Sequence, residues 1–188
     1  MLAGGPTAVG SGTLGGGEGF LYGRRSLARR LVISWPLSNS HIPMTSGGVI
    51  IQPEVVVFSW QLLRRRLPTR ENLAKRGIID NGPDTKCVWC PLASESEGHL
   101  FGGCNFASII WHKVFRWFGW DPVVPSDPLD IFQKFCVGSG NGQRIKGLLA
   151  VWHSVVWSIW RARNELIFNA IDPVIDDVFD GIIRQSWK

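Results

Sequence analysis

Three of the chain's four cysteines and one of its four histidines lie within eighteen consecutive residues. Their spacing is Cys87, two residues, Cys90, eight residues, His99, four residues, Cys104. Thiolate sulfur and imidazole nitrogen are ligands of tetrahedral Zn²⁺, and two cysteines separated by two residues can bind one ion from a single turn. Protein side chains would fill all four positions, which leaves no place for a substrate water. The spacing therefore predicts a structural zinc site.

Other interpretations of Cys87 and Cys90 stay open at this point. They could be a redox pair, although no strand precedes them in a thioredoxin-like pattern. They could form a disulfide, although an intracellular compartment would keep them reduced, or the spacing could be accidental. The fourth cysteine, Cys136, lies far along the chain in an apolar run, and we expect it to be a small buried hydrophobic residue.

Positive charge is concentrated around the cysteines. The net charge of the 188-residue chain is +5, and residues 1–60 sum to +2, residues 61–119 to +4 and residues 120–188 to −1. A nucleic-acid partner requires such a basic region, although basic surfaces are also common without a partner. Seven residues are candidates for phosphate contacts: Arg64, Arg65, Arg66, Arg70, Lys75, Arg76 and Lys86. Trp89 could stack on an unpaired base or pack against the helix expected over residues 69–77.

The first 52 residues differ in composition from the rest. Residues 1–23 are rich in glycine and are expected to be disordered, because they cannot bury enough apolar surface to offset their backbone entropy. Residues 24–31 are basic and free of acids, in the manner of an organelle transit peptide or of a basic arm for nucleic acid. Residues 34–52 carry prolines and glycines and are expected to be irregular.

From residue 53 onward, apolar residues recur at helical spacing. In the first helix, from Pro53, the predicted apolar stripe is Val56, Trp60, Leu63 and Leu67, with the arginines 64–66 at its end. Further helices are predicted over 69–77, 105–119, 128–135, 144–168 and beyond Pro173. The predicted fold is mainly α, with one zinc-pinned CCHC turn. Residues 53–120 would form the zinc-binding domain and residues 121–188 a helical extension packed on it.

Nothing in this pattern predicts a membrane span. Lys146, His153 and Arg161 interrupt the apolar centre of the long helix well short of the roughly 20 residues that a span needs. The ten tryptophans are instead expected to serve as large core residues. The sequence leaves the compartment open among nucleus, cytoplasm and an organelle.

An ordered series of motifs resembles a known family. It resembles the zinc-binding region at the C-terminal end of plant non-LTR (LINE-type) retrotransposon reverse transcriptases, over residues 53–120 and more loosely over 145–168. One departure is Asn105, where the family often has proline after the last cysteine. The matching segments are Phe58–Leu63, Arg66–Leu73, Arg76–Ile78, Cys87–Cys90, His99–Phe101, Cys104, Trp111 and Trp160–Asn164 with Phe168.

The resemblance implies a non-catalytic module that accompanies a polymerase and handles RNA or DNA. Reverse transcription needs paired carboxylates that hold two metal ions. The acidic pair here, Asp176 and Asp177, lies in a helix expected at the surface, and we assign it no catalytic role. The chain then has the character of a detached piece of a mobile element, one that need not function in isolation.

Two further functions are alternatives to nucleic-acid binding. The tryptophan-rich long helix could dock on a protein partner such as a polymerase domain. A hydrolase has little support, because His41, His112 and His153 are scattered along the chain and no serine has an evident partner base. His112 and His153 are expected to be ordinary helix residues rather than metal ligands.

Overall fold

The structure, a computed structural model, describes residues 51–91, 93–137 and 142–186. The predicted disorder and basic arm of the N-terminal segment lie outside these residues. The described part is mainly helical, as predicted, and contains no strand, only one isolated antiparallel bridge between Lys86 and Ser94. Its helices are α2 (Pro53–Leu63), α3 (Arg70–Lys75), α4 (Asn105–Phe118), α5 (Pro128–Val137), α6 (Gly142–Asn169) and α7 (Ile175–Ser186). Two short turns, η1 (Pro83–Thr85) and the π-helical η2 (His99–Gly103), lie between α3 and α4.

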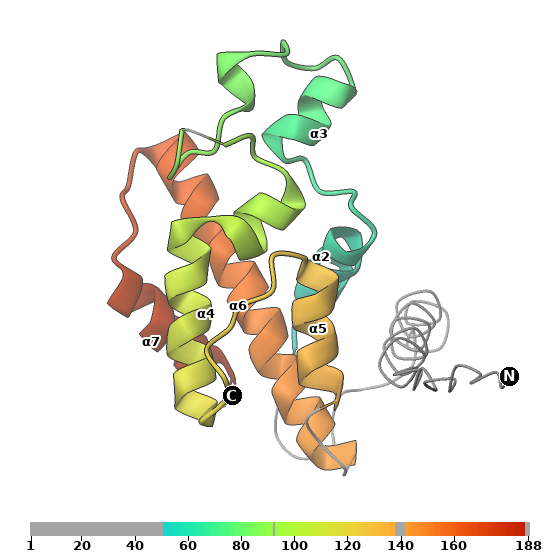
Figure 1. The fold of residues 1–188 in the computed structure, drawn as a ribbon, viewed down its shortest axis with the longest axis vertical. Helices are drawn as coiled ribbons and strands as arrows, with labels where there is room; N and C mark the ends of the chain where they lie inside the picture. The colour runs from blue at the N-terminus through green and yellow to red at the C-terminus, as the bar shows by residue number, and fades with distance from the viewer. Residues whose placement is uncertain (1–50, 92, 138–141, 187–188) are drawn as a thin grey trace, which may run out of the picture.

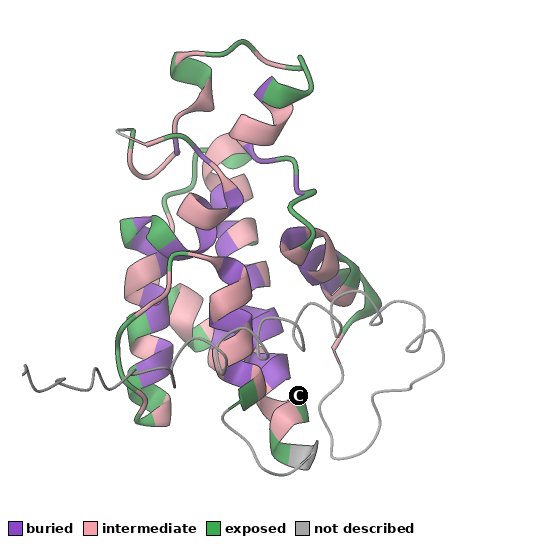
Figure 2. Cartoon of the chain, turned by 45° about the vertical axis from the view of Figure 1, so that its right-hand side comes forward, coloured by how far each residue is buried: buried purple, intermediate pink, exposed green. Residues whose placement is uncertain are grey.

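The long helix α6 runs through the middle of the molecule, and α2, α4, α5 and α7 pack against it (Figure 1). Helix α3, η1 and the cysteine-containing loop lie together at one end. Figure 2 shows that the buried residues of α4 and α6 face inward, whereas much of the loop after α3 is exposed. The helices therefore form the body of the fold and carry the cysteine-containing segment at its end.

Several helix boundaries follow from local sequence signals. Pro53 opens α2, and the Thr69 side chain accepts a hydrogen bond from the Asn72 N–H at the start of α3. Gly77 and Gly119 adopt positive φ angles of 69° and 67° just beyond α3 and α4, conformations that glycine adopts without steric cost. Asp127 Oδ1 accepts from the Leu129 N–H at the start of α5. These caps confirm the predicted helices.

The predicted stripe of α2 is wrong by about one residue within the helix, whereas Leu67, beyond its end, is buried. The structure buries Val55, Phe58 and Leu62, while Val56, Trp60 and Leu63 are half-buried, and the helix ends at Leu63. Phe58 packs edge-on against Trp157 of α6, with ring centroids 5.2 Å apart. Residues 55–58 are all apolar, so periodicity could not distinguish the two faces. The packing of the Phe58 ring against α6 decides between them.

One hydrophobic cluster joins all the large helices. Its fully buried side chains include Trp111 and Phe115 of α4, Phe135 of α5 and Trp152 of α6. The rings of Phe132 and Trp152 meet edge to face at 4.9 Å, which ties α5 to α6. Both predicted domains, residues 53–120 and 121–188, therefore contribute side chains to one core. Among the described residues, no helix combines the length and the hydrophobicity that a membrane crossing requires.

Candidate metal centre

The four predicted ligands come together at one point. One donor atom from each of Cys87, Cys90, His99 and Cys104 lies within 4.8 Å of every other. The Sγ atom of Cys104 is 3.8 Å from that of Cys87 and 3.9 Å from that of Cys90. A tetrahedron with Zn–S bonds of about 2.3 Å has S···S edges of about 3.8 Å, so these sulfurs stand at the separation that zinc requires.

His99 completes the set with its Nε2 atom, which lies 2.7 Å from Cys90 Sγ. All four cysteines are free, and sulfurs almost 4 Å apart are well beyond the disulfide bond length of about 2.05 Å. No disulfide joins the clustered cysteines in this structure, and the pairing of Cys87 with Cys90 stays an untested alternative. Three sulfurs and one imidazole nitrogen gathered at one point are the donor set of a structural Zn²⁺ site, although Nε2 lies closer to Cys90 Sγ than the roughly 3.5 Å edge of a zinc tetrahedron.

A short backbone turn positions the first two cysteines. The Cys87 N–H donates to Ala93 O at 2.9 Å, and the Glu95 N–H donates to Thr85 O at 2.8 Å. These bonds flank the isolated bridge between Lys86 and Ser94 and fold the segment back on itself. The backbone N–H groups of Trp89 and Cys90 donate to the Cys87 sulfur. Donors aimed at sulfur favour the thiolate form that a metal binds.

The π turn η2 positions the other two ligands. Its N-terminal side is held by Ser96, whose Oγ accepts from the His99 N–H at 3.1 Å, and the Cys104 N–H donates to His99 O at 2.6 Å. The wider π turn brings His99 and Cys104 to the same side of the backbone. The indole N–H of Trp111 donates to Phe101 O at 2.7 Å and anchors the turn to α4.

At Gly102 the π turn lies close against the backbone of Pro125 and Ser126. A Cβ atom at position 102 would lie 2.6 Å from Ser126 O and 2.8 Å from Pro125 O, both backbone atoms. Such distances are not tolerated, so only glycine lets the turn press against the loop before α5. At neighbouring Gly103 a Cβ would meet nothing closer than 3.7 Å.

The three clustered thiols change one another's pKa values. The hydrogen bond from Cys104 lowers the pKa of the Cys87 thiol to about 4, assisted by the two backbone N–H groups. The same bond, together with burial, raises the pKa of Cys104. Burial and the nearby charge of Cys87 raise the pKa of Cys90. A bound cation would favour ionisation of the thiols.

A buried ion pair fastens this segment to α6. The Glu95 carboxylate, fully buried, accepts from Arg163 Nη2 at 2.6 Å and from Arg163 Nε at 3.4 Å. Glu95 Oε1 also accepts from the Arg70 N–H at 3.0 Å, and so caps α3 as well. Glu95 could not be identified from the sequence, because its partner lies 68 residues away. The sequence hinted at this pair only through Arg163, which lies in residues 145–168, the segment with the looser resemblance to the family.

Glu97 plays a similar part on the other side of the turn. Its buried carboxylate accepts from Asn72 Nδ2 at 2.6 Å, and Asn72 Nδ2 also donates to Leu67 O at 2.9 Å. Together Glu95 and Glu97 attach the metal-binding segment to α3. Neither was singled out from the sequence, since acidic residues in a polar loop give no local signal of burial.

Some of the basic residues predicted to contact phosphate form hydrogen bonds or ion pairs within the molecule, and others are exposed. Arg65 pairs with Asp127 at 2.6 Å, Lys75 pairs with Glu71, and Arg76 Nη2 donates to Arg66 O at 3.1 Å. Arg70 Nη1 donates to Lys86 O at 2.9 Å. The Arg64 guanidinium lies over the Trp60 ring at 5.5 Å, and both Arg64 and Arg66 are exposed. Part of the predicted positive charge is thus engaged within the molecule.

The remaining candidates are placed as follows. Trp89 is half-buried and stacks on Phe106 of α4 with ring centroids 4.0 Å apart, rather than against α3 as the alternative interpretation had it.

The two other described histidines lie outside the metal centre. His112 is exposed on α4, and His153 is buried in α6; neither belongs to the cluster. Cys136 is half-buried rather than buried as expected, and this partial burial raises the pKa of its thiol to about 11. Asp176 pairs with Lys113 at 2.6 Å.

The family described as zinc-binding in reverse transcriptase has a model that matches residues 48–111. The matched segment contains all four clustered side chains and ends at Trp111, the residue that anchors the π turn. This match supports a reverse-transcriptase zinc-binding domain in that part of the chain. No curated protein and no solved structure gives a significant match.

Proposed function

We propose that the protein is a zinc-stabilised, non-catalytic module that binds RNA or DNA through a basic surface. The observation that supports it most is the Cys3His cluster within the segment that matches the reverse-transcriptase family. On the resemblance of its ordered motifs, we further propose that the module derives from a plant LINE-type element. A bound zinc ion would join the Cys87 turn to the π turn and so supply folding energy rather than chemistry.

Exposed cations support the nucleic-acid part of the proposal. Arg64 and Arg66 are exposed at the end of α2, and the half-buried Lys86 lies beside the metal centre. Among the described residues, the side chains of Arg66 and Lys86 form no hydrogen bond or ion pair, since only their backbone oxygens accept, so phosphate contacts would cost no internal bond. Such contacts release counterions and are sequence-independent.

Binding of the full chain to labelled RNA and DNA at two salt concentrations tests this proposal. Salt-sensitive binding is expected, and Arg64→Gln/Arg66→Gln should weaken it uniformly and reduce the salt slope by about two. The matched control is Arg144→Gln/Arg161→Gln, two exposed arginines of α6. Arg65 is left unchanged because its ion pair with Asp127 is structural. Absence of salt-sensitive binding to every nucleic acid would reject the proposal.

A second candidate function is docking on a polymerase domain. The tryptophans of α6 do not provide the surface, because Trp152 is fully buried and Trp157 and Trp160 pack against the core. The favouring observation is Phe168, which is 74 % exposed at the end of α6, followed by exposed Ile171 and Val174. Co-purification with a co-expressed reverse-transcriptase polymerase domain, lost on Phe168→Ser, would favour this function. Without either activity the chain is a fragment with no function of its own.

A further inference from the structure

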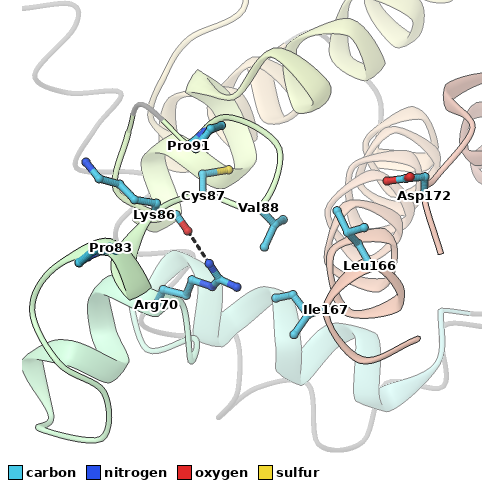
Figure 3. Close-up of a pocket in the computed structure, with 9 residues that line it drawn as sticks. All are labelled: Arg70, Pro83, Lys86, Cys87, Val88, Pro91, Leu166, Ile167 and Asp172. Carbon is cyan, nitrogen blue, oxygen red and sulfur yellow. Dashed lines mark hydrogen bonds between the residues drawn. The ribbon is translucent and has the colours of Figure 1, made fainter. Parts of the chain in front are cut away.

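A groove of about 990 Å³ lies between the metal-binding segment and the end of α6 (Figure 3). This volume is within the range of about 300–1,000 Å³ typical of small-molecule sites. One wall comes from the cysteine turn and the other from α6 and the segment after it. The lining residues are Arg70, Pro83, Lys86, Cys87, Val88, Pro91, Leu166, Ile167 and Asp172.

The middle of the groove is apolar. Val88 points across it toward Leu166 of α6, with Ile167 beside them (Figure 3). All three side chains are half-buried, so their apolar atoms remain partly accessible. A flat ring inserted here would contact aliphatic carbon on both faces. Such hydrophobic contacts would stabilise binding of any base, because every base has two flat faces.

Arg70 supplies a cation that is already held in place. Its Nη1 donates to Lys86 O at 2.9 Å, and Figure 3 shows the guanidinium directed toward Ile167. An arginine fixed by one bond loses little further freedom when its other N–H groups bind an anion or its plane stacks on a base. Lys86 points its amine outward at the rim, on the side away from α6.

We propose that this groove seats an unpaired base of single-stranded nucleic acid. Val88, Leu166 and Ile167 would enclose the ring, and Arg70 would bind its phosphate or stack on its plane. Lys86 would meet the next phosphate where the strand passes over the cysteine turn. Asp172, at the far end of the groove, offers acceptor oxygens to an amino group of the base.

This inference rests on the proposed nucleic-acid binding and makes it more specific. Two cations beside an apolar slot complement a chain that alternates phosphates with flat rings, and a duplex keeps its rings stacked inside and could not fill the slot. One wall of the slot is the turn that carries two metal ligands. Zinc would therefore shape the binding site while taking no part in the contact.

The test compares two substitutions that add the same charge. Ile167→Glu places a carboxylate in the groove, and Val123→Glu places one at a position that is 67 % exposed and does not line it. Anisotropy of the full chain is measured with a labelled single-stranded RNA and with its duplex. Ile167→Glu should weaken single-strand binding by about tenfold or more and change duplex binding little. Val123→Glu should leave single-strand binding within about twofold of wild type, because counterion release changes only modestly.

The outcomes separate this inference from the function on which it rests. If the wild-type chain binds nucleic acid but the two variants weaken it equally, the groove proposal is overturned and the basic surface stands. If the wild-type chain binds none, both fail. Should Ile167→Glu fail to fold, photocrosslinking of wild type to RNA containing 4-thiouridine decides the question. Crosslinks on peptides with Val88 or Ile167 support the groove, and crosslinks elsewhere only would overturn it.

Discussion

His99 supplies the nitrogen among the four clustered side chains, and a redox pair of Cys87 and Cys90 would not need it. We therefore expect His99→Ala to lower zinc content and thermal stability about as much as Cys104→Ala, since each leaves three ligands. His99→Cys should be the mildest change, because a thiolate replaces imidazole on zinc with a bond only about 0.2–0.3 Å longer. Metal content by mass spectrometry and thermal unfolding of the purified chain measure these effects.

The control for this series is His112→Ala. His112 is exposed on α4 and stands outside the cluster, so its loss should leave zinc content unchanged. Full zinc occupancy together with wild-type melting in His99→Ala would disprove the assignment of four ligands.

Gly102 and Gly103 form a matched pair within the π turn. Gly102→Ala should destabilise the protein by about 1–3 kcal/mol, because its Cβ would overlap the backbone of Ser126. Gly103→Ala should change stability by less than about 0.5 kcal/mol, since its Cβ would make ordinary contacts. Urea unfolding of the zinc-loaded protein measures both. Equal effects of the two substitutions would mean that the close approach at residue 102 is not maintained in solution.

Between elements, the buried pair of Glu95 and Arg163 joins the metal-binding segment to α6. Removing one partner leaves an uncompensated buried charge, so Arg163→Met should reduce the free energy of unfolding by about 3–5 kcal/mol. The control is Arg161→Met on the same helix, an exposed position at which the expected change is below about 0.5 kcal/mol. Urea denaturation at neutral pH compares the two variants.

A double variant shows whether the loss comes from the pair itself. Glu95→Gln/Arg163→Met removes both charges and should be less destabilised than the sum of the two single variants. Strict additivity would indicate that the two side chains do not interact in solution, contrary to the 2.6 Å contact.

For the whole molecule, the core centre contains a titratable group, His153. Ser59 Oγ donates to Val55 O at 2.8 Å and therefore accepts the proton of His153 Nδ1 at 2.7 Å. Burial lowers the pKa of His153 to about 4, so the folded protein keeps it neutral. The unfolded chain protonates this histidine near pH 6.5. Stability should thus fall as pH drops from about 6.5 to 4, by about 3 kcal/mol from this group.

His153→Asn tests this dependence, since the Asn amide keeps a donor near Ser59 but does not titrate. The variant will be less stable at pH 7.5 because of its smaller volume, and the informative quantity is the slope. Between pH 6.5 and 5 the variant should lose less stability than wild type in urea unfolding. Acid release of zinc affects both proteins alike and cancels in the comparison. Parallel slopes would show that His153 is not held neutral in the fold.

One hydrophobic core also spans the two predicted domains. Phe101 and Trp111 before residue 120 and Phe135 and Trp152 after it belong to one hydrophobic cluster. The family match ends at residue 111, before α5, α6 and α7 begin. The C-terminal helices therefore complete the core on which the matched segment rests, and the division at residue 120 into a zinc-binding domain and a helical extension stays a prediction.

What the sequence determined by itself is local. The four ligands lie within eighteen residues, so a turn and a short π helix suffice to bring them together. Thr69, Gly77 and Gly119 act on backbone groups a few residues away, so their effect on helix ends could be predicted from the types of neighbouring residues. The mainly α fold follows from the same kind of local periodicity.

Tertiary structure alone decided the features that depend on distant partners. The buried face of α2 and the stacking of Trp89 on Phe106 both differ from the local expectation. Glu95 is buried because Arg163 reaches it from α6, and the groove exists because α6 ends beside the cysteine turn. An apolar or charged side chain gains stability only from the surface that it meets, and the packing of the helices, not the order of the residues, determines which surface that is.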